Sequence, residues 1–249
     1  MKVELNYKGQ NFQTDLSTPH DISIPFEEGE GHVLAWYQGP VKMEAVRMGD
    51  WVGDVKQGAG VNFRNVFFNP HAHGTHTETV GHISPNLESI NSHFKEYFCF
   101  ANLISLLPVQ MESDLIITLE QIKAACPSPA DAIIIRTLPN DDLKLSKNYS
   151  CSNPPYLQHE AASWLRESGV RHLMIDLPSV DREEDGGKLL SHHAFWNFPE
   201  ATRLDATITE LVFVADAIKD GFYFMNLQVA PFVNDAAPSR PLLFELKKI

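Results

Sequence analysis

The sequence predicts an α/β fold in which a helix connects two buried strands. Ala132 to Arg136 contains three consecutive isoleucines, a continuous apolar run typical of a strand buried on both faces. After a break at Asn153 to Pro155, apolar residues recur at helical spacing from Leu157 to Leu165, and Gly169 lies where a C-terminal cap is expected. Val170 to Leu177 then resembles a second strand. Such crossovers place ligands at the ends of strands.

Length and composition favour one large domain, or one domain with a small insertion. The chain has 249 residues, of which 43% are hydrophobic, so it can bury the core of a single domain over residues 1–249. Its formal net charge of -12 repels polyanions. We therefore expect neither nucleic acid nor an anionic membrane surface as a partner. The small-molecule substrate that we also expect follows from the motifs described below and not from net charge.

The amino terminus and the cysteines favour a cytoplasmic protein. Met1 to Lys8 alternates apolar with polar residues, unlike a secretory signal, and no apolar run is long enough for a transmembrane helix. The three cysteines, Cys99, Cys126 and Cys151, are odd in number and lack close paired spacing. This pattern predicts reduced thiols, and none of them lies beside a histidine in a catalytic motif.

The first third of the chain is expected to contain strands and a turn-rich wall. Alternation predicts strands at Val3 to Tyr7 and at Phe12 to Ser17. Residues 18–60 are rich in glycine and proline around an aromatic strand from His32 to Gln38. Three aromatic residues of this region are candidates to stack on a planar substrate, although packing against the sheet explains them equally well. They are Trp36, Tyr37 and Trp51.

Further elements follow from local patterns. Val61 to Phe68 is apolar and β-prone, which predicts a strand leading into the histidine-rich stretch described below. Phe98 to Val109 predicts a buried strand, and Thr118 with Gln121 forms a capping box for a helix from 119 to about 126. Gly221 to Pro231 and Leu242 to Leu246 predict the last strands.

Residues 69–83 hold four of the eleven histidines together with a glutamate. Neutral imidazole and ionised carboxylate bind zinc, manganese or iron, so this stretch predicts a metal site. If the chain is extended after Gly74, then His76, Glu78 and His82 differ by even numbers, and their side chains leave the same face of the strand. A histidine-rich surface loop without metal is the alternative. The candidate ligands are His71, His73, His76, Glu78 and His82.

Three segments resemble the metal-dependent cyclase family, which includes bacterial kynurenine formamidases and isatin hydrolases. Gly74 to His82 resembles the family signature His-x-Gly-Thr-His-x-Asp-x-Pro-x-His. Asp15 to Ser17 resembles the Asp-Leu-Ser of the family's first strand, and Ile175 to Asp181 followed by His192 resembles its later Asp-x-x-Ser-x-Asp and histidine block. The resemblance covers most of the chain and identifies it as a divergent member.

The chain departs from the signature at three positions. Ala72 occupies the place of the family's first histidine, so either His71 or His73 is expected to substitute for it. Glu78 replaces the aspartate ligand, which keeps the charge and lengthens the side chain by one methylene. Val80 replaces the proline. The number and identity of the metal ions stay open.

The resemblance implies a fold, a cofactor and a second half of the site. The fold is a swivelling β/β/α domain with mixed sheets and flanking helices. The cofactor is zinc or manganese, one or two per chain, and the assembly is a homodimer or homotetramer. His192 and Glu210 match the family's downstream ligands, although the neighbouring His193 is an alternative to His192 as the ligand. If His192 is the ligand, His193 is a candidate to orient a ligand or to contact substrate.

The implied activity is hydrolysis of an amide or lactam bond, as in arylformamidases, by metal-activated water. His82 is the expected proton shuttle, because the ordinary histidine pKa lies near working pH, and Glu210 is expected to be essential for catalysis. A cyclase or dehydratase acting on a polyketide-like or sugar-derived acid is one alternative. A non-catalytic metal- or ligand-binding protein is another. No Gly-x-Ser-x-Gly, Rossmann or phosphate-loop motif supports a serine hydrolase or a nucleotide cofactor.

Overall fold

Seven strands close into a mixed barrel in the computed structural model, which describes residues 1–249. The strand order is β16-β9-β12-β14-β15-β8-β17-β3, and β16 also pairs with β17, so the first strand meets the seventh and β3 is an addition to β17. The strands are β3 (His20–Asp21), β8 (His76–Glu78), β9 (Phe98–Leu106), β12 (Ala132–Thr137), β14 (His172–Ile175), β15 (Thr207–Glu210), β16 (Gly221–Val229) and β17 (Ala236–Glu245).

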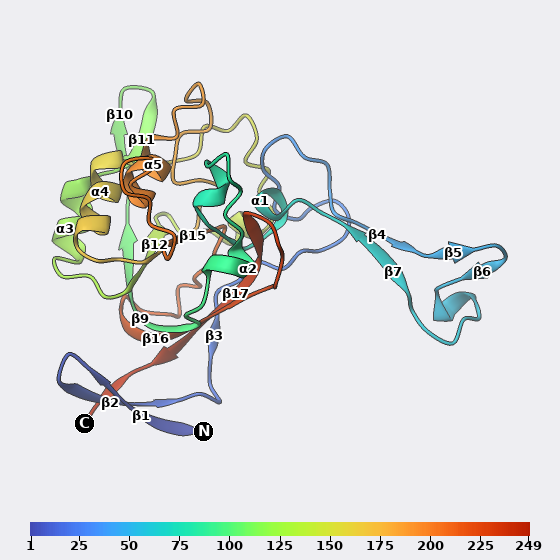
Figure 1. Ribbon diagram of the computed structural model, residues 1–249, viewed down its shortest axis with the longest axis horizontal. Coiled ribbons are helices and arrows are strands. Elements are labelled where there is room, and N and C mark those ends of the chain that lie inside the picture. Colours follow the sequence, from blue (N-terminus) through green and yellow to red (C-terminus); the bar gives the residue numbers. More distant parts are fainter.

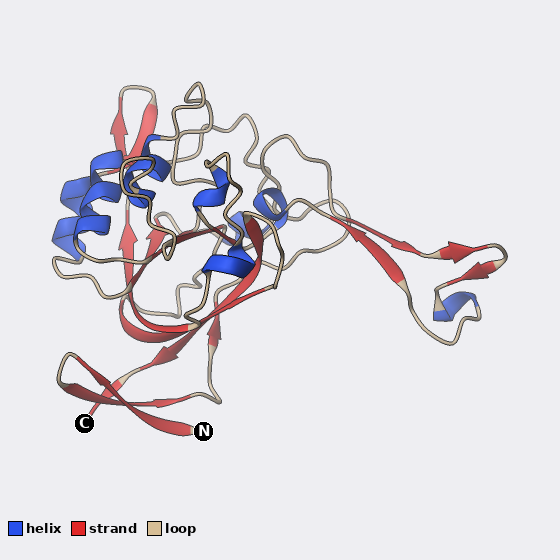
Figure 2. Ribbon diagram, in the orientation of Figure 1, coloured by secondary structure: helices blue, strands red, loops and turns tan.

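Strand directions make this sheet mixed, as expected. Strands β9, β12, β14 and β15 are parallel to one another, whereas β8, β17 and β16 run antiparallel to their neighbours. Three helices lie beside the parallel strands (Figures 1 and 2). They are α3 (Leu119–Ala125), α4 (His159–Glu167) and α5 (Leu190–Trp196). The α/β prediction is therefore confirmed.

Strand β12 explains why the parallel strands are apolar throughout. Ile133 and Ile135 belong to the apolar cluster that contains the buried faces of the three helices, whereas Ile134 belongs to a second cluster with β16 and β17. All three side chains are fully buried. Each contributes about 1.5–3 kcal/mol of hydrophobic free energy, so alternation with polar residues is not tolerated here.

Local helix signals hold. Thr118 and Gln121 form the expected capping box at the start of α3. Gly169 has a φ of 88°, the left-handed conformation expected just beyond the end of α4.

The cysteines Cys99, Cys126 and Cys151 are all free thiols. None of the helices combines the length and apolar character needed to cross a bilayer.

Two small sheets flank the barrel. Both chain ends lie in the first of them, at the bottom of Figure 1. It contains β1 (Lys2–Tyr7), β2 (Gln10–Asp15) and β18 (Lys247–Lys248), which confirms the two expected N-terminal strands. The second contains β10 (Val109–Met111), β11 (Asp114–Ile117) and β13 (Tyr156–Leu157).

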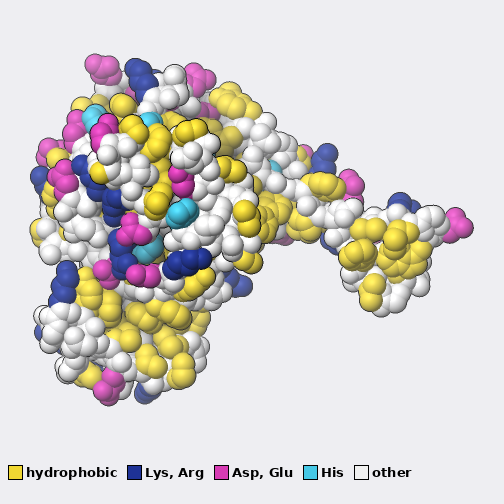
Figure 3. All heavy atoms as spheres, in the orientation of Figure 1, with side chains coloured by type: hydrophobic (Ala, Val, Ile, Leu, Met, Phe, Trp, Pro, Cys, Tyr) yellow, Lys and Arg dark blue, Asp and Glu magenta, His cyan; other side chains and the backbone are white.

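Residues 41–68, called the arm below, project away from the barrel (Figure 1). The arm consists of β4 (Lys42–Ala45) paired with β7 (Arg64–Phe67), β5 (Arg47–Met48) paired with β6 (Trp51–Val52), and the 3-10 helix η1 (Val55–Gln57). The strand expected at Val61 to Phe68 is thus present as β7, although all four of its residues are exposed. Hydrophobic side chains gather at the far end of the arm (Figure 3).

The prediction of an aromatic strand at His32 to Gln38 is wrong. Only Leu34 makes a bridge, with Asn148, and the chain turns immediately afterwards. Trp36 and Tyr37 have φ values of 55° and 58°, which a strand does not accommodate. Aromatic composition favours strands, but the local turn overrides it here.

Candidate metal centre

The histidine-rich stretch folds into three short elements. They are α1 (Pro70–His73), β8 (His76–Glu78) and the 3-10 helix η2 (Val80–His82). The Asn69 side chain caps α1, and the Thr79 hydroxyl accepts a hydrogen bond from the Gly81 N–H at the start of η2. The expected extended run therefore ends at Glu78, and His82 enters the site from a helical turn. Two other short helices lie elsewhere in the chain, α2 (Ile90–His93) and η3 (Asp142–Leu145).

Gly74 lets α1 and β8 meet at a sharp angle. A Cβ atom at this position would lie 2.8 Å from the carbonyl oxygen of Ile24 and 2.8 Å from the ring of Phe26. Its φ of 168° is ordinary extended backbone, so close approach and not the left-handed conformation is what requires glycine. This packing holds His71 and His76 on the two sides of one turn.

The register of β8 brings distant residues together. In the sheet, β8 lies between β15 and β17, with Glu210 opposite His76 and Ala236 opposite Glu78. The Nε2 atom of His76 therefore lies 3.4 Å from the Oε2 atom of Glu210. Asp235, the residue before Ala236, reaches the same cluster from the start of β17.

Glu78 is the centre of the cluster. Its side chain is fully buried, and its Oε1 atom lies 3.2 Å from Nε2 of His192. Its Oε2 atom lies 3.2 Å from Nδ1 of His71 and 3.7 Å from Nδ1 of His82. One carboxylate thus faces three imidazoles that come from α1, η2 and α5.

Two aspartates orient the histidines from outside. The carboxylate of Asp181 lies 2.6 Å from Nδ1 of His192 and also accepts the backbone N–H groups of Ser191 and His192. Asp235 Oδ2 lies 3.0 Å from Nε2 of His71 and 3.3 Å from Nδ1 of His82. Carboxylates that fix ligand histidines in this way are common around protein-bound metals.

The sequence does not assign a role in the site to either aspartate. Asp181 lies in the segment that resembles the family's Asp-x-x-Ser-x-Asp block, and this resemblance is the signal that could have indicated it. No sequence motif contains Asp235.

The charges of the cluster compensate one another. Burial favours a lower pKa for His71, but hydrogen bonds with Asp235 and Glu78 outweigh it and raise that pKa to about 10. The pKa of His192 is likewise raised against burial by its bonds to Asp181 and Glu78. Burial favours a higher pKa for Glu78, but the neighbouring histidines hold it well below its usual range. The pKa values of Asp181 and Asp235 are also held below their usual range by hydrogen bonds with these histidines, so the three carboxylates stabilise positive charge at this point.

The donor set fits a divalent cation. Nε2 of His76 and Oε2 of Glu78 are buried and have no hydrogen-bond partner, although each lies within ion-pair distance of a neighbour. Buried polar atoms are rarely left without a partner, and nitrogen and carboxylate oxygen are ligands that zinc and manganese accept. The potential ligand atoms of three overlapping groups lie within 4.8 Å of one another. The groups are His71, His76 and Glu78; His71, His82 and Asp235; and Glu78, His82 and His192.

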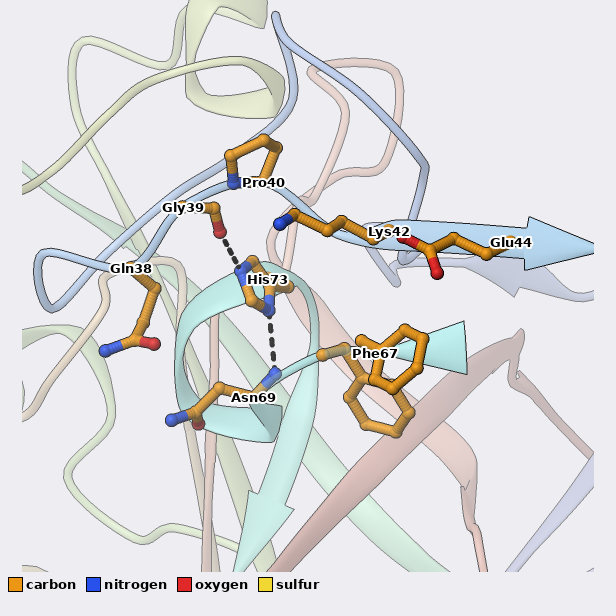
Figure 4. Close-up of a pocket in the computed structure, with 9 residues that line it drawn as sticks. Gln38, Gly39, Pro40, Lys42, Glu44, Phe67, Asn69 and His73 are labelled. Carbon is orange, nitrogen blue, oxygen red and sulfur yellow. Dashed lines mark hydrogen bonds between the residues drawn. The ribbon is translucent and has the colours of Figure 1, made fainter. Parts of the chain in front are cut away.

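His73 lies outside this cluster, so the alternative that makes it the ligand is wrong. Its Nδ1 atom accepts a hydrogen bond from the Asn69 N–H at 2.8 Å, and its Nε2 atom lies 2.7 Å from the Gly39 carbonyl. Figure 4 shows both contacts at the base of the arm. The short helix α1 directs His71 and His73 to different sides, because neighbours two apart do not share a helix face.

The candidate substrate residues are not gathered around the cluster. Trp51 lies at the end of the arm and packs near Phe63, so its expected contact with a substrate of the same chain is wrong (Figure 1). His192, and not His193, lies beside Glu78. The Nδ1 atom of His193 lies 3.0 Å from the carbonyl of Phe198, and its candidate contact with substrate stays a prediction. The two remaining candidates belong to a neighbouring region and stay predictions.

Trp36 and Tyr37 are those two residues. Trp36 packs against the apolar cluster that contains Leu211, the residue after Glu210. Tyr37 is exposed and donates a hydrogen bond from its hydroxyl to Glu183. Their backbone runs close to α1, since the N–H of Ala35 donates to the carbonyl of Ala72.

Barrel and cluster together define a mixed α/β protein with a buried histidine and carboxylate centre of the kind that holds divalent cations. Residues 15–182 match the model of the "Cyclase" family, described as "Putative cyclase". This match covers more than half of the 249 residues, and the chain belongs to that family. Among curated proteins, none matches the sequence.

Solved structures share the fold at low sequence identity. One, described as a potential metal-dependent hydrolase with cyclase activity, has a TM-score of 0.65 at 20% identity and covers 92% of this chain and 98% of its own. A predicted metal-dependent hydrolase from Bacillus stearothermophilus has a TM-score of 0.61 at 19% identity, over 91% and 98% of the two chains. An isatin hydrolase bound to the product analogue thioisatinate has a TM-score of 0.64 at 13% identity, over 92% of both chains. These likenesses establish the cyclase-like fold.

Proposed function

We propose that the chain is a metal-dependent hydrolase that cleaves an amide or lactam bond of a small molecule, with arylformamides as the first substrates to test. The observation that carries this proposal is the pair of unpartnered buried atoms, His76 Nε2 and Glu78 Oε2, within a ring of histidines and carboxylates. Membership of the cyclase family and the hydrolase descriptions of structural relatives support the same reaction class.

Five residues would hold the cation, zinc or manganese, at one or two positions. His71, His76 and Glu78 offer ligand atoms on one side, and His192 and Glu210 offer them on the other. Such a cation, when bound, supplies an acidified water nucleophile and positive charge opposite a developing oxyanion. The buried carboxylates hold the ligand nitrogens in place, and the closed barrel supports them rigidly.

His82 would move the proton. Its side chain is 30% exposed, whereas His76 and His192 are buried, so it borders the accessible side of the cluster. Because Nδ1 faces Asp235 at 3.3 Å, Nε2 is the ring atom left to exchange a proton. In this mechanism Nε2 accepts a proton from the attacking water and delivers it to the departing nitrogen as the C–N bond breaks.

Metal analysis is the first experiment. Protein purified without chelator is expected to contain about one or two equivalents of zinc or manganese per chain. His76→Ala should lose this metal, whereas His159→Ala, which changes an exposed histidine on α4, should retain it. The loaded protein is then offered N-formyl anilines and lactams, and product formation is followed by the release of formate or the opening of the ring.

Other outcomes separate the remaining functions. A loaded protein that ignores amides and lactams but eliminates water from, or cyclises, a polyketide-like or sugar-derived acid is a cyclase or dehydratase that uses the same cation and the same histidine. A protein that binds metal and turns over none of these compounds is a binding protein. No metal in wild type after addition of zinc and manganese contradicts the proposed hydrolase.

A further inference from the structure

Asp235 touches two members of the cluster at once. Its Oδ2 atom lies 3.0 Å from Nε2 of His71 and 3.3 Å from Nδ1 of His82. Its side chain is 13% exposed, so the contact is largely shielded from water. This carboxylate therefore links a candidate metal ligand to the candidate proton shuttle through a single oxygen, as Oε2 of Glu78 also does.

The backbone holds Asp235 firmly in this position. The carbonyl of Asp235 accepts the N–H of Thr79 at 3.0 Å and also the Thr79 hydroxyl. Thr79 connects Glu78 to η2, the turn that carries His82. The next residue, Ala236, is paired with Glu78 in the sheet. The carboxylate, the central glutamate and the shuttle histidine thus share one rigid frame.

The two nitrogens of His71 face different groups. Nε2 points to Asp235, whereas Nδ1 lies 3.2 Å from Oε2 of Glu78, one of the two unpartnered atoms. If Nε2 carries the hydrogen and donates it to Asp235, the lone pair of Nδ1 points toward Glu78 and His76. This arrangement presents three ligand atoms to one point.

We infer that Asp235 is a positioning residue that fixes the tautomer and ring orientation of His71, and through the same oxygen orients His82. His71 lies on the four-residue helix α1, one residue before the place of the family's first histidine, and Asp235 contacts the ring nitrogen that faces away from Glu78. The inference rests on the proposed metal centre, but its test needs no substrate. Residues that orient a ligand histidine typically account for 10- to 100-fold in metal affinity.

The test is a double-mutant cycle on Zn²⁺ affinity, measured by competition with a chromophoric chelator. Asp235→Asn keeps the size of the side chain and should weaken Zn²⁺ binding by about 10- to 100-fold. In a His71→Ala background the same substitution should change the affinity by less than about twofold, because Asp235 acts through His71. Asp21→Asn, a carboxylate paired with Arg240 on the surface, is the matched control and should change nothing.

Two results overturn the inference. Equal Zn²⁺ affinity of wild type and Asp235→Asn shows that the carboxylate does not position His71. A full loss of affinity in both backgrounds shows that Asp235 binds the metal directly or acts independently of His71. Absence of Zn²⁺ binding by wild type overturns the proposed function as well, so the two failures are distinguishable.

A spectroscopic readout supports the cycle if Asp235→Asn folds poorly. In Zn²⁺-loaded protein labelled with ¹⁵N-histidine, the ring signals of His71 should report hydrogen on Nε2 and none on Nδ1. The gentler variant Asp235→Glu should retain this tautomer with altered chemical shifts. A wild-type spectrum with hydrogen on Nδ1 of His71 contradicts the assigned geometry.

Discussion

Glu210 and His76 lie opposite each other on the neighbouring antiparallel strands β15 and β8. Their side chains are buried, and Oε2 of Glu210 lies 3.4 Å from Nε2 of His76. The partners are 134 residues apart in the chain, and only the pairing of β15 with β8 brings them together. Glu210 is also held from the other side, since the Val180 N–H donates to its Oε1 atom at 3.0 Å. The two halves of the candidate site are thus joined by sheet register.

Glu210→Gln should therefore remove metal without unfolding the barrel. The amide oxygen still accepts the Val180 N–H, whereas the charge that a cation needs is lost. We expect the metal content to fall and turnover to drop by about 100-fold or more. Loss of a residue that only orients a metal ligand typically costs about 10- to 100-fold, and loss of a ligand should cost more. Elemental analysis and a thermal melt check both points. Full turnover with wild-type metal content contradicts the assignment of Glu210.

His82→Ala should separate metal binding from proton transfer. The side chain is partly exposed and lies 3.7 Å from Glu78, farther than the other histidines that face this carboxylate. We expect metal content close to wild type and a rate of amide hydrolysis lower by about 10²- to 10⁴-fold. An unchanged rate with metal bound excludes His82 as the shuttle.

Local patterns predicted much of the fold and half of the site. The isoleucine run of β12 and the capping box of α3 depend on neighbours in sequence, so both were recognisable. His76 and Glu78 lie on the same face of β8, as even spacing requires. The resemblance to the cyclase family supplied His192 and Glu210, which no local periodicity could connect to them.

The remainder depended on tertiary structure. Asp235 is brought in by the pairing of β17 with β8, and no motif marks it. The choice between His71 and His73 depended on the direction of a four-residue helix. Trp51 was expected near the site because its aromatic ring can stack on a planar substrate, but the arm that contains it projects away from the barrel. Register, helix direction and the path of an arm are set by contacts that a single sequence does not display.

His172 should make folding stability depend on pH below neutrality. Burial, together with the nearby positive charge of Arg171, lowers its pKa from 6.5 to about 4, and Nδ1 bonds the Thr207 hydroxyl. Between these values the unfolded chain binds a proton that the folded chain does not, so stability is present above pH 6.5 and lost as the pH falls. The loss between pH 7 and pH 5 should be about 2 kcal/mol.

Urea unfolding of wild type and His172→Gln at the two pH values isolates this contribution, because all other titrating groups are shared. The stability difference between the two proteins should shrink at pH 5 by about 2 kcal/mol. If it is the same at both pH values, His172 is not the neutral buried group described.

Gly74→Ala should destabilise the protein although the backbone there is not left-handed. The added Cβ would meet the Ile24 carbonyl and the Phe26 ring, both at 2.8 Å, and the carbonyl cannot move without disturbing its hydrogen bond to the Thr75 N–H. Overpacking of this kind costs about 1–3 kcal/mol. Urea unfolding should show this loss, with Gly39→Ala, where a Cβ meets no atom within 4 Å, as the control.

The arm should bury its apolar side chains against a second copy of the chain. A two-stranded ribbon is marginally stable alone, yet this one exposes Met48, Val61 and Phe63 by 60%, 58% and 53%. It carries four basic and three acidic residues, so the acidic body of another copy does not repel it. We therefore propose a homodimer or homotetramer. The double variant Met48→Asp, Val66→Asp should sediment as a monomer in sedimentation velocity. The control Leu143→Asp, which changes an exposed residue outside the arm, should keep the wild-type oligomeric state. A monomeric wild type at micromolar concentration contradicts this role for the arm.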